Sequence, residues 1–100
     1  MSGSGGFSSG SSITTPCNNL KFQTNIASPK TTALSLSIGD VLDITVQGDA
    51  LKLLHNGTIV GGIACKESSR LLYCIEQGNN YEAEVIKVNL AKITVSVYPL

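Results

Sequence analysis

The sequence lacks tryptophan, and only 5% of its residues are aromatic. The core must therefore be built mainly from Ile, Val and Leu, a composition that favours β-sheet. Hydrophobic residues make up 42% of the 100 residues, enough for one core in a single domain. No apolar run is long enough to cross a bilayer, and the N-terminus lacks the basic and apolar regions of a signal peptide. We therefore expect a cytoplasmic protein with no membrane partner.

The chain also lacks an excess of charge of either sign. Seven Lys and Arg residues balance seven Asp and Glu residues. A neutral chain has no general attraction for phosphate backbones, which argues against strong non-specific binding of nucleic acid. A local basic face remains open.

Cysteines are few and odd in number: Cys17, Cys65 and Cys74. A disulfide framework needs an even and dense set. We therefore expect three reduced thiols, with Cys65 and Cys74 buried as small hydrophobic side chains. A zinc site needs four ligands, and the three cysteines and the lone His55 are irregularly spaced. We expect no metal and no cofactor.

Gly and Ser dominate residues 1–16. Such a segment buries almost nothing and would lose much chain entropy on ordering, so a disordered tail is predicted there. Residues 17–100 are predicted to form a single β-rich domain. Within it, apolar and polar residues alternate with the period of a strand at 19–26, 41–47, 81–88 and 93–98. Two more strands, at 51–55 and 58–64, are predicted as the arms of a hairpin.

Glycine marks the turns of this pattern. Asn56-Gly57 predicts a type I′ hairpin turn, because both central residues of that turn need a positive φ. Gly61-Gly62 inside a predicted strand indicates a bulge or a closely packed backbone. Residues 31–38 carry mixed signals and are predicted as an irregular connection.

One amphipathic helix is predicted over 66–77, because Leu71, Leu72 and Ile75 fall on one face. Ser68 or Ser69 can cap its start, and Gly78 can end it in a left-handed conformation. Five or six short strands with one main helix favour a mainly β fold, a small OB-like barrel. The alternative is an α+β fold, a curled antiparallel sheet with the helix on one face.

Residues with catalytic chemistry are sparse. His55 is the only histidine, and no spacing pairs it with a cysteine or a carboxylate. The glycine pair lacks the Lys-Ser/Thr of a phosphate-binding loop. We expect no enzymatic activity and no catalytic residues. An enzyme would need His55 and a cysteine or carboxylate to meet in a pocket.

Basic and aromatic residues suggest a binding module instead. Lys66 and Arg70 are four residues apart on the predicted helix, so they point the same way. Lys52 on the hairpin can join them, and Tyr73 or Tyr81 can supply a ring for a base to stack on. We therefore predict binding of nucleic acid, with Lys52, Lys66 and Arg70 on phosphates and Tyr73 on a base.

Two other interpretations stay open. Charges on the outer face of a helix often only keep it soluble. The domain can also be an adaptor or regulatory module that binds another protein, for example along the strand predicted at 93–98. Cations that converge on one face favour nucleic acid, whereas a large exposed apolar patch favours a protein partner.

Residues 55–98 resemble the second half of a HIRAN domain. The resemblance lies in Asn56-Gly57 with Ile59-Val60-Gly61, in Ile75-Glu76-Gln77-Gly78 closing the helix, and in Tyr81–Val85 followed by Ile93–Val95. HIRAN domains are small OB-like barrels, fused to DNA-remodelling or repair enzymes or found alone in bacteria and phages, and some bind single-stranded DNA ends. The resemblance implies the barrel fold and single-stranded or end-containing DNA as the ligand.

The sequence departs from this family before the hairpin. HIRAN sequences usually carry an Asn-Pro-x-Asp-like segment there, and this chain has Gln47-Gly48-Asp49-Ala50. The aromatic and basic residues of the DNA pocket have no match in the first half, so DNA-end binding does not follow from the fold alone. The chain also looks like small bacterial proteins with a Gly/Ser-rich start.

Overall fold

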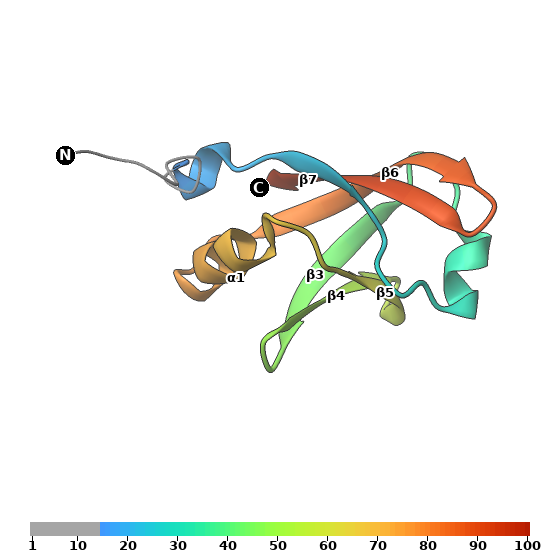
Figure 1. Ribbon diagram of the computed structural model, residues 1–100, viewed down its shortest axis with the longest axis horizontal. Coiled ribbons are helices and arrows are strands. Elements are labelled where there is room, and N and C mark those ends of the chain that lie inside the picture. Colours follow the sequence, from blue (N-terminus) through green and yellow to red (C-terminus); the bar gives the residue numbers. More distant parts are fainter. Residues whose placement is uncertain (1–14) are drawn as a thin grey trace.

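The computed structural model describes residues 15–100. Most of the predicted disordered tail, residues 1–14, lies outside the described residues. The described chain is mainly β, as predicted: six antiparallel strands form one curled half-barrel sheet in the order β2-β7-β6-β3-β4-β5 (Figure 1). The strands are β2 (Phe22–Asn25), β3 (Val41–Gln47), β4 (Ala50–His55), β5 (Thr58–Ile63), β6 (Tyr81–Asn89) and β7 (Lys92–Pro99).

Helical segments connect these strands. The helix α1 (Ser68–Glu76) stands between β5 and β6, and two short 3-10 helices are η2 (Cys17–Asn19) and η3 (Thr31–Ser35). The predicted irregular connection at 31–38 therefore contains a short helical turn. No helix within residues 15–100 has the length and apolar character needed to cross a bilayer.

The core is aliphatic, as the composition predicts. On β7 the alternate residues Ile93, Val95 and Val97 are fully or almost fully buried, and Val97 pairs with the buried Ala83 of β6. From α1, Leu71 and Cys74 are buried against the same cluster. Period-two alternation therefore identified the buried faces of these strands correctly.

The Asn56-Gly57 turn has the predicted backbone, with φ of 52° at Asn56 and 84° at Gly57. Because both angles are positive, the turn joins β4 and β5 into a tight hairpin. The β4–β5 register shifts between Leu53 and Leu54, which pair with Gly61 and Ile59, so that Val60 next to the glycine pair is left without a partner on β4. The bulge predicted from the glycine pair is therefore present.

The glycine pair also accepts a second backbone, because the chain leaving β2 crosses to β5 (Figure 1). Ala27 N–H donates to the Gly62 carbonyl at 2.8 Å, and Gly62 N–H donates back at 2.9 Å. A Cβ atom at Gly61 would lie 2.3 Å from Ile26 Cγ2. The segment that follows β2 thus meets β5, the outer strand at the other end of the sheet order, at one seam, which we call the β2–β5 seam (Ala27 and Gly62).

The helix is confirmed, but the prediction for its start is wrong. The residue before the first helical residue is Glu67, and it makes no side-chain capping hydrogen bond. Ser68 is already helical, and its Oγ accepts the Cys65 N–H at 2.9 Å. At the other end Gly78 has a φ of 98°, the left-handed conformation expected.

The expectation of three reduced thiols is also wrong, because Cys17 and Cys74 form a disulfide, while Cys65 is free. Two further interactions hold the same segment. Arg70 donates from Nη2 and Nε to the Thr15 carbonyl at 2.7 and 3.2 Å, and Tyr81 Oη donates to the Cys17 carbonyl. We call Thr15, Cys17, Arg70, Cys74 and Tyr81 the N-terminal clasp.

Candidate functional site

The four predicted binding residues do not converge on one site. Arg70 and Tyr73 do meet on α1, where the guanidinium carbon lies 5.0 Å from the ring centroid. Lys66 precedes the first helical residue, so the argument that helical spacing aims it with Arg70 does not hold. Lys52 stands on β4, where it lines a hollow with Lys30.

Arg70 already has a structural role. Two of its nitrogens hold the Thr15 carbonyl, and its guanidinium lies over Tyr73. Tyr73 as a whole residue remains 49% exposed. Tyr73 is therefore accessible to a stacking ligand, while much of the hydrogen-bonding capacity of Arg70 is used inside the chain.

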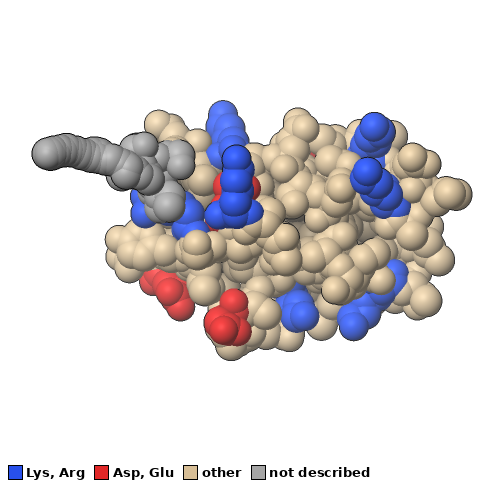
Figure 2. Space-filling view, viewed as in Figure 1, with Lys and Arg blue, Asp and Glu red and all other residues tan. Residues whose placement is uncertain are grey.

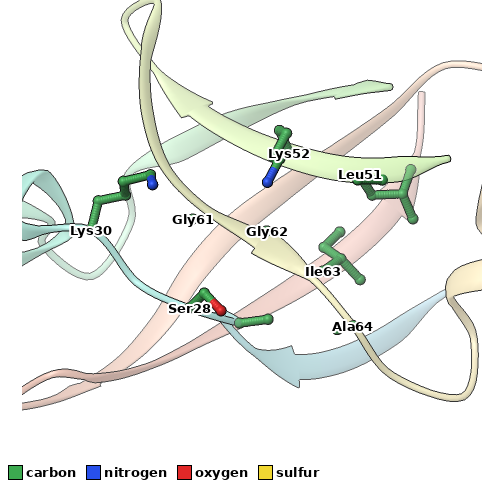
Figure 3. Close-up of a pocket in the computed structure, with 10 residues that line it drawn as sticks. Ser28, Lys30, Leu51, Lys52, Gly61, Gly62, Ile63 and Ala64 are labelled. Carbon is green, nitrogen blue, oxygen red and sulfur yellow. The ribbon is translucent and has the colours of Figure 1, made fainter. Parts of the chain in front are cut away.

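A hollow of about 200 Å³ opens beside β4 and β5 (Figure 3). Lys30 and Lys52 contribute to its wall, and within residues 15–100 neither ammonium group has an ion-pair partner. Two unpaired cations beside one hollow can bind an anion, because each ammonium group has three donors free to contact phosphate or carboxylate oxygens. Its lining residues are Ala27, Ser28, Lys30, Ala50, Leu51, Lys52, Gly61, Gly62, Ile63 and Ala64.

The β2–β5 seam positions these two lysines. Figure 3 shows Lys30 and Lys52 on either side of β5, with Gly61 and Gly62 between them. Lys30 is held by its own N–H, which donates to the Val60 carbonyl at 2.9 Å. Sequence reasoning missed Lys30 because this contact joins residues 30 apart, and no local signal reports it.

Charge is segregated along the chain although its total is zero. Residues 40–84 hold all seven acidic residues and three cations, a net side-chain charge of −4. Residues 17–39 and 85–100 hold four lysines and no acidic residue, a net charge of +4. These acid-free segments form β2, β7 and the distal part of β6, which are neighbours in the sheet. Figure 2 shows most of the red atoms in the half of the face that bears α1.

His55 lies near one carboxylate, that of Asp40, but Asp40 does not line the hollow that His55 lines. Its Nε2 lies 3.9 Å from Asp40 Oδ2, beyond hydrogen-bond distance. His55 also lines a hollow of about 380 Å³ with the hydroxyl residues Thr32 and Ser35.

Neither hydroxyl is arranged as a nucleophile. Thr32 Oγ1 donates to the Ile59 carbonyl at 2.7 Å, and Ser35 Oγ donates to the Thr32 carbonyl at 3.0 Å. Nucleophilic catalysis needs a hydrogen bond from the nucleophile to its base, and neither hydroxyl makes one to His55. Across residues 15–100 no three His, Cys, Asp or Glu side chains are grouped to hold a metal ion.

Comparison with known proteins finds no matching protein family, no similar curated protein and no similar solved structure.

Proposed function

We propose that this domain is a non-catalytic binding module and that nucleic acid is its ligand, with phosphates bound by Lys30 and Lys52. The observation that supports this most is that two ammonium groups without an ion-pair partner line one hollow, with Gly61 and Gly62 between them. The glycines let the chain's own backbone at Ala27 pack against β5, and this packing holds the segment that carries Lys30 beside the hollow.

The fold and the family resemblance favour the same ligand class. Small OB-like barrels often bind oligonucleotides across a sheet face and its loops. The resemblance of residues 55–98 to HIRAN domains implies single-stranded or end-containing DNA. Tyr73, exposed beside Arg70, is the ring on which a base would stack. Lys66 has no structural feature that supports a role.

Two phosphate contacts give weak and salt-dependent binding. Each neutralised phosphate contributes a slope of about −0.7 for single strands to a plot of log affinity against log salt. Lys30 and Lys52 together should therefore contribute a slope of about −1.4.

Fluorescence anisotropy with labelled single- and double-stranded DNA tests this proposal. The double variant Lys30→Ala/Lys52→Ala should lose most of the binding at low salt and flatten the salt dependence. The matched control Lys21→Ala/Lys66→Ala removes the same charge elsewhere and should bind like the parent protein. Equal weakening in both variants would show only general electrostatic attraction, and no binding at low salt would reject nucleic acid as the ligand. A Tyr73→Ala variant tests the stacking role separately.

The cellular location bears on this proposal. Disulfides persist mainly in oxidising compartments, so the Cys17–Cys74 bond argues against the predicted cytoplasmic location. Trapping thiols with an alkylating reagent in intact cells, followed by mass spectrometry, decides the matter. If Cys17 and Cys74 are both alkylated, the two thiols are reduced in the cell. The protein would then lie in a reducing compartment, where nucleic acid is also present.

A further inference from the structure

Exposed leucines gather at the end of the molecule that carries η3 and the tip of the β6–β7 hairpin. Leu90 in the hairpin turn is 88% exposed, and Leu34 in η3 is 66% exposed. Figure 1 shows η3 beside this hairpin, at the end opposite α1. A hollow of about 150 Å³ is lined by both Leu34 and Ala91, so the two segments are in contact range. Large exposed apolar side chains at one place are typical of an interaction surface.

Lysines border these leucines, and acidic residues are missing from the segments involved. Lys30 lines the same hollow as Leu34. Lys92 directly follows Ala91 in the hairpin, and together with Lys87 it lines a separate small hollow with Asn89 and Thr94. None of these three lysines has an ion-pair partner within residues 15–100. We call Leu34, Leu90 and Ala91, with Lys30 and Lys92 at their border, the hairpin-end surface.

We propose that the hairpin-end surface binds an acidic segment of a partner protein that carries an apolar anchor residue. The anchor side chain enters the hollow between Leu34 and Ala91, and the flanking carboxylates contact Lys30 and Lys92. A volume of about 150 Å³ suits a single aliphatic side chain, and such anchors in pockets supply most of the affinity of protein interfaces. This goes beyond the proposed function, because it assigns a second ligand class to a neighbouring surface that shares only Lys30 with the first.

Nucleic acid fits this surface less well. Leu90 is almost fully exposed, and an aliphatic side chain gains nothing from a phosphate backbone. No aromatic ring lines the hollow, so bases have no stacking platform. A bilayer fits less well too, since a flat lipid surface leaves a side-chain-sized hollow unfilled.

NMR titration of the ¹⁵N-labelled full chain with a synthetic peptide of alternating Asp and Leu tests the proposal. Amide shifts should concentrate at η3 and at the hairpin turn. A peptide of alternating Asp and Ser lacks the apolar anchor, and a peptide of alternating Lys and Leu reverses the charge. Neither control peptide should shift these amides. The variant Leu34→Ser/Leu90→Ser should weaken binding at least about tenfold, which corresponds to 1.4 kcal/mol. Both positions are exposed, so the variant should keep a folded spectrum.

The control variant Lys52→Ala separates this proposal from the nucleic-acid one, because it should weaken DNA binding and leave peptide binding unchanged. Absence of shifts up to about 1 mM peptide, the range of the weakest specific complexes, would overturn the proposal. It would also be overturned if vesicles of phosphatidylcholine with phosphatidylserine, or DNA, gave the shifts at the hairpin turn and the peptide did not.

Discussion

Reduction of the Cys17–Cys74 disulfide should cost this small domain much of its stability. The bond joins residues 57 apart in sequence, and in the chain-entropy description a closed loop of that length stabilises the folded state by about 4 kcal/mol. A domain of this size has a total stability of about 5–15 kcal/mol. Reduction should therefore lower the free energy of unfolding by a quarter or more.

Guanidinium unfolding followed by circular dichroism measures the effect, with and without a phosphine reductant. The midpoint should fall on reduction for the parent protein. The variant Cys17→Ala should unfold at the lower midpoint under both conditions, because it has no bond to reduce. Equal midpoints for the oxidised and reduced parent would refute the reasoning. So would three titratable thiols in the unfolded, non-reduced protein, since Cys65 alone should react.

Two further predictions concern the β2–β5 seam and the clasp. A Gly61→Ala variant places a Cβ 2.3 Å from Ile26 Cγ2 and 3.0 Å from the Ala27 carbonyl oxygen. This crowding should destabilise the fold by about 1–3 kcal/mol, measured by thermal unfolding. An unchanged Tm would contradict the prediction, because it would show that the seam moves apart at little cost. Burial raises the pKa of Tyr81 above its ordinary 10.0, with Arg70 opposing the shift. A raised folded pKa gives stability that is fully present below about pH 10 and is lost as the pH rises through the folded value. Unfolding measured from pH 8 upward should show that loss in the parent and a weaker one in Tyr81→Phe.

Local patterns in the sequence predicted most of the fold. Alternation located the strands, since their buried faces repeat every second residue, and Asn56-Gly57 predicted its turn because few other residues accept two positive φ angles in succession. The helix end at Gly78 follows from the same chemistry. The prediction misplaced the helix start because a serine near a helix terminus can either precede the helix as its cap or lie inside the first turn. Ser68 lies inside the first turn and accepts a hydrogen bond from the Cys65 N–H.

Contacts between distant segments were out of reach. The Cys17–Cys74 bond spans most of the domain, and an odd cysteine count gives no pairing. The hollow between Lys30 and Lys52 exists because residues after β2 cross to β5, a contact that composition and periodicity do not encode. The hairpin-end surface likewise could not be predicted from the sequence, because it forms only where η3 lies against the hairpin turn.

The seam also has a consequence for solubility. The segment Thr58–Ile63 is uncharged and holds the β-branched residues Thr58, Ile59, Val60 and Ile63. An outer strand of this kind can pair with other chains in intermolecular sheets when its edge is exposed. Its outer side is covered by residues 27–32: the carbonyls of Gly62, Val60 and Ile59 accept hydrogen bonds from Ala27, Lys30 and Thr32. The other outer strand, β2, is four residues long and follows Lys21, which discourages pairing along it. The crossing after β2 thus protects this edge of the sheet from pairing with other chains, and a variant that opens it would expose an uncharged strand edge to aggregation.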